Sequence, residues 1–437
     1  MREYAMRELE YWNDRIEELV LKAGLDCFEQ YFEIVSYEDM LCYSAYVGMP
    51  SHYPHWSYGK CYERQKSFYQ YNLAGLPYEM VINSDPCIAY LMRDNTLLLQ
   101  ILTIAHVYGH NDFFKNNRIF KRDTYPERTV EMFKTHANRV RQYNNDPSIG
   151  AEKVERILDA AHALRFQVCR HGEGRLPDKK QLAAEAAVTV PERLQEDLLA
   201  FLAERSPLLA EWERDLITIV REETLYFIPQ METKIMNEGW ASYWHYQLLN
   251  QLELPQGLQL EFLQRHNLVI RPHEGRINPY FVGFKMFEYL AKQPGGTAKI
   301  KEVRAEERDQ SFLRRFLNQE LCEELHLFSY AVDGEDIVVD EVADEEGWRK
   351  VRDTLAASVG LGVIPVIRPV SVEQGTLVLE HVYDGRELEL NYAKETLKYV
   401  AELWGAKVEL RTQIAGQAKL LICTADKLVS LQDTGTC

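Results

Sequence analysis

The stretch NTLLLQILTIAHVYGHNDFF, residues 95–114, is apolar almost all the way round. A helix with this pattern has no side suited to water and is expected to be buried on every face. His106 and His110 interrupt the apolar side chains, and they lie four residues apart. On an α-helix this spacing places both imidazoles on one face, one turn apart. The segment therefore predicts a buried helix whose two histidine rings point at one place.

The same spacing lets a helix present two ligands to a zinc ion. In the usual zinc hydrolase motif, a glutamate follows the first histidine directly and activates the metal-bound water. In this chain Val107 holds that position. The spacing alone is a weak signal, but two buried rings each need a hydrogen-bond partner or a cation. The pair therefore indicates metal binding, whereas hydrolysis would need a base from elsewhere.

A third ligand is predicted in METKIMNEGWASYWHYQLL, residues 231–249, which has the spacing of a second helix. Glu238 and His245 share one face of it with small residues at 241 and 242, which would let another helix approach closely. Glu238 can complete a His₂Glu shell for zinc or another divalent metal, with one position left open. The alternative for Glu238 is a capping or salt-bridging carboxylate. The string MNEGWA is similar to the segment that supplies the glutamate zinc ligand in gluzincin metallopeptidases.

No residue can be chosen as the base from spacing alone. Asp112 comes two residues after His110 and reaches the metal face only if the helix ends or distorts there. Glu131 can lie opposite the histidine pair, and His245 can support a ligand or bind substrate. The catalytic candidates are therefore His245, Asp112 and Glu131. A metal site without a catalytic base, used for stability or for ligand sensing, remains an alternative.

The composition narrows the class of protein. The 437 residues carry 50 Lys and Arg against 67 Asp and Glu, a net charge of −17. This charge repels phosphate backbones and anionic lipids, and no long basic run offsets it, so nucleic acid is not an expected partner. No window of roughly eighteen apolar residues predicts a membrane span. The first residues do not have the pattern of a secretory signal, and the eight cysteines form no CxxC pair, so we expect a cytoplasmic protein.

The sequence pattern changes near residue 325. Before it, apolar residues recur with helical spacing; after it, short strand-like segments alternate with two helical ones. We predict an α+β protein with a large, mainly helical domain at residues 1–325, which carries a zincin-like site, and a small α+β domain at residues 326–437. A helix is also expected to begin at Pro86. Other helices are predicted at residues 8–24, 95–114, 129–144, 150–168, 191–203, 207–226, 233–252, 311–325, 348–360 and 393–406. Strands are predicted at residues 78–83, 325–332, 336–342, 363–370, 376–384, 386–392, 407–414 and 419–425.

Several longer strings resemble the hallmark blocks of the SpoVR family, the stage V sporulation protein R-like proteins. They are HWSYGK at residues 55–60, VINSDP at 81–86, AHVYGHNDFFKNN at 105–117 and PQMETKIMNEGWASYWHY at 229–246. The strings LEHVYDGREL and TLKYVAELWG extend the resemblance into the second predicted domain. The likeness covers nearly the whole chain and includes both strings of the predicted metal site.

The resemblance implies a role in late sporulation, in assembly of the peptidoglycan cortex, and a location in the cytoplasm of the mother cell. Relatives also occur in bacteria that make no spores, and no reaction comes with the family name. From the site itself we expect, if the protein is an enzyme, metal-assisted hydrolysis of an amide in a peptide or peptidoglycan precursor. The alternative is a non-catalytic regulatory or scaffold protein, with a structural or vestigial metal site and a C-terminal domain that binds protein partners.

Overall fold

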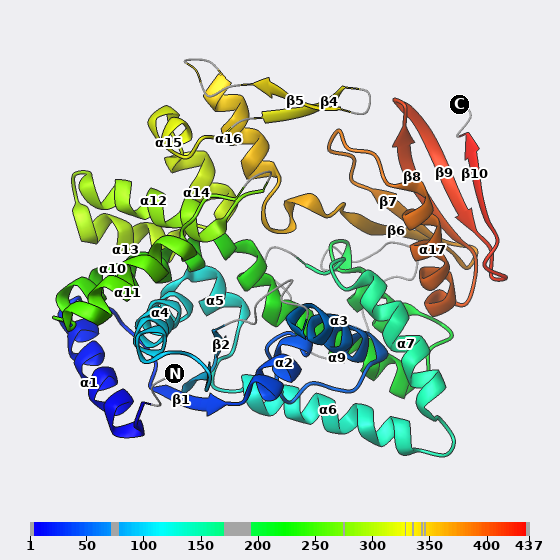
Figure 1. Cartoon of the computed structure of the whole chain (residues 1–437). Coiled ribbons are helices and arrows are strands. Elements are labelled where there is room, and N and C mark those ends of the chain that lie inside the picture. The colour runs from blue at the N-terminus through cyan, green and yellow to red at the C-terminus, as the bar shows by residue number, and fades with distance from the viewer. Residues whose placement is uncertain are drawn as a thin grey trace. The chain divides into compact units, whose positions relative to one another are not determined.

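The computed structural model describes residues 4–70, 78–169, 194–273, 276–327, 329–333, 336–341, 344 and 347–433 (Figure 1). It is α+β, with a mostly helical N-terminal region and a small sheet domain near the C-terminus, which confirms the predicted class. The chain forms two compact units. Unit 1 contains Met1–His52, Trp56–Lys134 and Pro229–Gly360, and unit 2 contains Tyr53–His55, Thr135–Ile228 and Leu361–Cys437. The domain boundary expected at residue 325 stays a prediction.

Unit 1 is built around three helices, of which α10 packs against both α4 and α12 (Figure 1). Its smaller elements surround them. The bounds are α1 (Met6–Lys22), β1 (Gln30–Val35), α2 (Tyr37–Ala45), α3 (Trp56–Gln70), β2 (Glu79–Ile82), β3 (Cys87–Met92), α4 (Leu97–Asn116), α5 (Arg118–Asp123), α10 (Lys234–Gln251), α11 (Gln256–Val269), α12 (Pro279–Lys292), α13 (Gly296–Glu306), α14 (Asp309–Phe316), α15 (Gln319–Glu324), β4 (Ser329–Asp333), β5 (Asp336–Glu341) and α16 (Gly347–Ala357). Among the described helices, none combines the length and apolar character that a membrane crossing requires.

Helix α4 begins after Thr96, whose side-chain oxygen accepts a hydrogen bond from the Leu99 backbone N at 3.2 Å. Every residue from 98 to 114 is buried, as the apolar pattern predicts. Helix α10 crosses α4 at Gly109. A Cβ added there would lie 2.6 Å from the Ala241 Cα, so glycine is required for this close approach. These two small residues set the distance between α4 and α10.

The first turn of α10 is held by a carboxylate from another helix. Thr233, which precedes α10, makes no capping hydrogen bond with its side chain. Instead, the two carboxylate oxygens of Asp309, at the start of α14, accept hydrogen bonds from Ile235 N at 2.8 Å and Met236 N at 2.9 Å. Asp309 is itself buried. It therefore satisfies two backbone donors that would otherwise lack partners.

Replacing Asp309 with alanine is expected to lower the free energy of unfolding by about 2 kcal/mol, because two buried N–H groups lose their acceptor. Asp309→Asn keeps one acceptor oxygen and is expected to lose less. Urea titrations of the two variants and the wild type check this order. Wild-type stability in Asp309→Ala would show that the carboxylate does not hold the helix.

A three-stranded sheet in unit 1 has the order β1-β3-β2, with β1 parallel and β2 antiparallel to β3. The strand predicted at residues 78–83 is confirmed as β2. The helix predicted from Pro86 is wrong, because the chain continues as β3. Cys87, Ala89 and Leu91 are buried in alternation, which is the period of a strand. Pairing with the distant β1 fixes this choice, and local capping signals could not reveal it.

Unit 2 contains a five-stranded sheet with the order β10-β9-β8-β7-β6. Strands β7 and β8 are parallel and are joined through α17, and the other neighbours are antiparallel. Helix α17 packs against the sheet and against α7. The bounds are α7 (Ala151–Leu164), α8 (Leu198–Arg205), the 3₁₀ turn η3 (Gly360–Val363), β6 (Ile367–Glu373), β7 (Thr376–His381), α17 (Leu390–Trp404), β8 (Val408–Ile414), β9 (Gln417–Cys423) and β10 (Val429–Asp433), while α6 (Thr129–Asn145) and α9 (Glu211–Glu232) contain residues of both units.

Three predictions of secondary structure need correction. The strand at 386–392 is wrong, because Glu389 caps α17 and accepts hydrogen bonds from the backbone N of Asn391 and Tyr392. The single helix at 311–325 is two helices, α14 and α15. Strand β10 is missing from the predicted set, because it is short and four of its five residues are exposed. The elements β1, α2, α3, α5, α11, α12 and α13 were not predicted either. Of the helix predicted at 191–203, residues 191–193 lie outside the described part, and α8 begins only at Leu198, after its capping residue Asp197.

In unit 2, His136 of α6 is buried between two carboxylates of α9. Its Nδ1 lies 3.1 Å from Glu223 Oε1, and its Nε2 lies 3.1 Å from Glu222 Oε2. Burial alone lowers the pKa of His136, but the hydrogen bonds to both glutamates outweigh burial and leave this pKa raised. Burial also raises the pKa of Glu223 to about 7. In both groups the folded state binds protons more tightly than the unfolded chain does.

Protein stability is therefore expected to fall as the pH rises from about 6 to about 8. The contribution of His136 is complete below its unfolded pKa of about 6.5 and is lost as the pH rises through the higher folded pKa. Urea titrations at the two pH values measure this change. The double variant His136→Gln/Glu223→Gln is expected to remove most of it, because Glu223 without His136 would keep a raised pKa. An undiminished change in the double variant would refute the assignment.

Candidate metal centre

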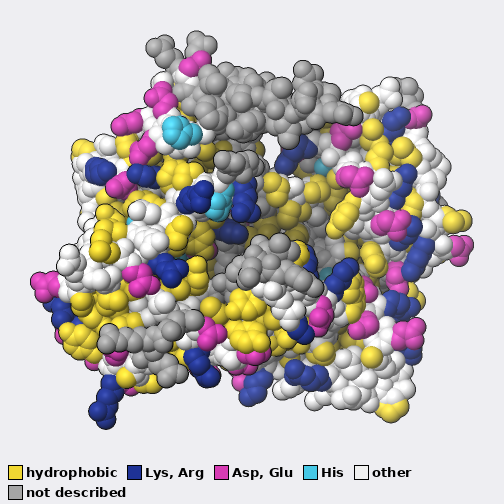
Figure 2. All heavy atoms as spheres, viewed as in Figure 1, with side chains coloured by type: hydrophobic (Ala, Val, Ile, Leu, Met, Phe, Trp, Pro, Cys, Tyr) yellow, Lys and Arg dark blue, Asp and Glu magenta, His cyan; other side chains and the backbone are white. Residues whose placement is uncertain are grey.

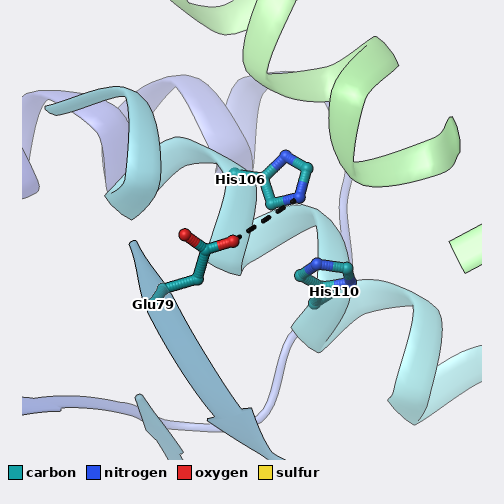
Figure 3. Close-up of side chains that lie close together, drawn as sticks. All are labelled: Glu79, His106 and His110. Carbon is teal, nitrogen blue, oxygen red and sulfur yellow. Dashed lines mark ion pairs between the residues drawn. The ribbon is translucent and has the colours of Figure 1, made fainter. Parts of the chain in front are cut away.

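Strand β2 and helix α4 bring one carboxylate and two imidazoles together. Glu79, the first residue of β2, points at the face of α4 that carries His106 and His110 (Figure 3). One ligand atom from each of the three lies within 4.8 Å of the others. Glu79 Oε1 is 4.0 Å from His106 Nε2. Both histidines are buried, and Glu79 is partly buried, so the three groups meet away from bulk solvent.

Helix α10 adds a second carboxylate. Glu238 Oε2 lies 3.7 Å from His106 Nε2 and 3.5 Å from His110 Nε2. In a tetrahedral zinc site with bonds of about 2.0 to 2.1 Å, two ligand atoms are about 3.4 Å apart. The observed separations are close to this value. The structure therefore brings together the three predicted ligands His106, His110 and Glu238, and metal binding by them stays a prediction.

Two atoms of this group are buried and have no hydrogen-bond partner, namely His106 Nε2 and Glu238 Oε2. Buried polar atoms in proteins are almost always satisfied, and each exception calls for an explanation. Both atoms are acceptors when the imidazole is neutral and the carboxylate is charged, and they face each other across 3.7 Å. A cation between them would satisfy both.

Hydrogen bonds fix the orientation of both histidine rings. His110 Nδ1 lies 2.9 Å from Asn237 Oδ1, which can only accept, so Nδ1 donates and the Nε2 lone pair faces Glu238. His106 Nδ1 lies 2.9 Å from His245 Nδ1, and His245 Nε2 lies 2.8 Å from His266 Nδ1. Metal-binding histidines usually make such a bond through their second nitrogen. Nε2 is therefore available as an acceptor in His110, and it is available in His106 when Nδ1 of that ring donates to His245.

The local electrostatics keep the ligand atoms in their metal-binding forms. Burial and the neighbouring His106 lower the pKa of His110 to about 4, so this imidazole is neutral at neutral pH. Burial raises the pKa of Glu238, but His106, His110 and Tyr280 outweigh it and leave this pKa lowered. Burial raises the pKa of Glu79, and the charge of Glu238 adds to the rise. A neutral imidazole and an ionised carboxylate are the forms that bind metal.

The chain is similar to known proteins over ranges that include these residues. The family described as SpoVR like protein matches residues 3–186 and 174–364, and the one described as SpoVR-like C-terminal domain matches residues 365–415. The chain belongs to the SpoVR family. A relative from Escherichia coli (strain K12), described as uncharacterized protein YcgB, is 32% identical over 467 residues, which cover 92% of this chain and 90% of the relative. No solved structure matches.

Glu79, His106, His110 and Glu238 are called the SpoVR cluster below. Two of the predicted catalytic residues lie away from it. Asp112 is buried, accepts hydrogen bonds from Asp26 N at 2.8 Å and Trp240 Nε1 at 2.9 Å, and pairs with Arg304 at 3.4 Å. Glu131 is 75% exposed and lies 4.0 Å from Lys134. The structure therefore places Asp112 in a packing network and Glu131 at the surface. Neither carboxylate is among the groups that meet His106 and His110.

His245, the third predicted catalytic residue, does lie at the SpoVR cluster. It is fully buried, and its Nδ1 contacts Nδ1 of His106, which is the His106 nitrogen that does not face the carboxylates. Its other nitrogen contacts His266, which the sequence did not point to. This contact is the one expected if His245 supports a ligand, and its place in the cavity wall also suits substrate binding, so both predicted roles stay predictions.

Glu79 is the group that the sequence prediction missed. It comes from a strand, and no spacing relates it to His106, because the two meet only through the packing of β2 beside α4. The only available signal was its place at the start of the predicted strand. Val107 occupies the position of the glutamate in the usual zinc motif. Glu79 of β2 supplies a carboxylate near the histidine pair instead.

The SpoVR cluster lies beside a cavity of about 650 Å³. Glu79, His106, Glu238 and His245 all contribute to its wall. This volume falls within the range of small-molecule sites. Two of the three proposed ligands, His106 and Glu238, therefore border a space of the size that small molecules occupy.

Replacing His245 with phenylalanine is expected to weaken zinc binding by about 10- to 100-fold, because His106 loses the partner that fixes its orientation. Phenylalanine fills a similar volume, so the fold should persist. Competition titrations with a coloured chelator measure the affinity, and the exposed His326→Gln serves as a control. Unchanged affinity in His245→Phe would show that the hydrogen bond does not support the site.

Proposed function

We propose that this SpoVR protein binds a divalent metal, zinc in the first place, through His106, His110 and Glu238, and hydrolyses an amide bond. The observation that carries the proposal is the pair of unsatisfied buried atoms, His106 Nε2 and Glu238 Oε2, beside the cavity. Two imidazoles and one carboxylate are the ligand set of several catalytic zinc sites, which keep a further position open. Membership of the SpoVR family supports a substrate among the peptides or peptidoglycan precursors of the spore cortex.

Glu79 is the residue proposed as general base. A bound metal would supply a polarised carbonyl and an activated water. Glu79 reaches the cluster from β2, and its Oε1 lies 4.0 Å from His106 Nε2. This places it within reach of a water at the cluster and lets it take the part of the glutamate absent at Val107. Tyr280 donates a hydrogen bond to Glu238 and so orients the ligand carboxylate.

The alternative is a closed, non-catalytic site in which Glu79 is a fourth ligand. It is supported by the grouping of Glu79 with both histidines within 4.8 Å. In that case the metal would stabilise unit 1, and the protein would act as a regulator or scaffold, with partners bound through its C-terminal domain.

Glu79→Gln separates the two functions. If Glu79 is the base, the variant keeps its zinc and loses about 10²- to 10⁴-fold in hydrolysis rate. If Glu79 is a ligand, the zinc affinity falls instead. The assay measures amine release from peptides and peptidoglycan fragments by the zinc-loaded protein, with the exposed Glu302→Gln as the matched control. Absence of hydrolysis by the wild type with all these substrates would reject the enzymatic function.

The physiological part of the proposal, cortex assembly in the cytoplasm of the mother cell, can be tested in a spore-forming bacterium. A strain whose own copy carries His110→Ala is expected to form spores with a defective cortex. If the purified variant lacks zinc and the cortex of that strain is normal, the metal site is not required for cortex assembly.

A further inference from the structure

The cavity beside the metal cluster has an apolar wall and a polar rim. The cluster residues lie on one part of its surface, and Tyr78, Asn278 and Tyr280 lie near them. The apolar part of the wall comes from α4, α11 and the segment before α12, and consists of Leu99, Leu102, Leu268, Val269 and Ile277. Such a lining accommodates hydrocarbon groups and leaves orientation to a few polar contacts.

The charges around this cavity differ from those of the chain as a whole. The face drawn in Figure 2 carries acidic and basic side chains interspersed, and the chain has 17 more acidic than basic residues. Around the cavity, the lining cations are Lys234, Arg265 and Arg276. The carboxylates among the described lining residues are Glu79 and Glu238, both in the cluster. With a divalent metal bound, the two cluster charges are balanced and the rim stays positive.

The three cations are not equally available. Arg265 Nε lies 3.7 Å from Glu261, which takes up part of its charge. Lys234, at the start of α10, and Arg276, just before α12, are exposed. A guanidinium binds carboxylate or phosphate through two parallel hydrogen bonds, and an ammonium adds a point charge. Lys234 and Arg276 are therefore the groups of the rim best suited to an anion.

We propose that the substrate carries an anionic group, a carboxylate or a phosphate, which Lys234 and Arg276 bind while the bond to be cleaved lies at the cluster. The inference rests on the proposed function and adds the class of substrate to it. An apolar part of the substrate lies along Leu99, Leu102 and Leu268, where binding removes apolar surface from water. The substrate is thus amphipathic, with its charge at a distance from the reacting carbonyl.

The test uses calorimetric titration of the zinc-loaded full chain at low ionic strength. The probes are inorganic phosphate and N-acetylalanine, titrated separately, and the zinc content of each sample is measured first. Arg276→Gln and Lys234→Gln are each expected to weaken binding of at least one probe by about tenfold, a loss typical of one charged contact. The exposed Arg128→Gln and Lys292→Gln, which do not line the cavity, are expected to match the wild type.

The probes separate the two sources of negative charge. Weakened phosphate binding alone indicates a phosphorylated substrate, and weakened N-acetylalanine binding alone indicates a carboxylate. A zinc-loaded wild type that binds neither probe, or cavity variants that bind both probes as the wild type does, would overturn the inference while leaving the metal site in place. A wild type without zinc would reject the proposed function, and this inference with it.

Discussion

Gly283→Ala is expected to lower the free energy of unfolding by more than about 3 kcal/mol. A Cβ at Gly283 would lie 2.1 Å from the Ile235 carbonyl oxygen and 2.7 Å from the Gly239 Cα. Both neighbours are backbone atoms of α10, so no side chain can rotate away. The methyl group must push α10 and α12 apart along their contact.

The matched control is Gly257→Ala, in α11, where an added Cβ meets nothing within 4 Å. That variant is expected to be as stable as the wild type or slightly more stable, because alanine favours a helix. Thermal and urea unfolding of both variants provide the comparison. Equal stability of Gly283→Ala and Gly257→Ala would show that α10 and α12 are not in the close contact described.

The same contact connects the fold with the site. Glu238 precedes Gly239 on α10, and Gly109 on α4 lies against Ala241 of α10. A shift of α10 by an ångström would move Glu238 relative to both histidines. If Gly283→Ala still folds, we therefore expect it to bind zinc more weakly than Gly257→Ala does.

Removing the metal is expected to destabilise the wild type by about 4 kcal/mol when the free zinc had been about 1,000 times its dissociation constant. Two carboxylates and two imidazoles then face one another without a cation, and this cost is already contained in the dissociation constant. Urea titrations with and without a chelator measure the change. Glu238→Gln is expected to be insensitive to the chelator, and Glu302→Gln is expected to respond as the wild type does. A wild type that the chelator does not affect would contradict a bound metal.

Local patterns predicted the parts of the site that lie on helices. The apolar circumference of α4 and the spacing of His106 and His110 describe one face of one helix, and the structure has them as predicted. The small residues of the MNEGWA segment predicted the close helix approach that brings Glu238 to the pair. These features depend on residues three or four apart, for which helix geometry gives direct rules.

The remaining parts depend on pairing between distant segments. Glu79 reaches the cluster because β2 pairs with β3 and packs beside α4, and no sequence spacing encodes that contact. The hydrogen bond between His245 of α10 and His266 of α11 is another contact that no sequence spacing encodes. Asp112 could reach the metal face only if the helix ended or distorted there, but α4 continues to Asn116 and Asp112 contacts Trp240 instead. Long-range contacts, unlike periodicity, could not be predicted from the residues alone.

The zinc content of the purified chain tests the central claim most directly. After loading with zinc and dialysis, the wild type and Glu302→Gln are expected to hold about one zinc per chain, the number that one His₂Glu site takes. His110→Ala and the nearly isosteric Glu238→Gln are expected to hold almost none while remaining folded. Zinc content that is the same in all four proteins, or absent from the wild type, would contradict the metal centre described for His106, His110 and Glu238.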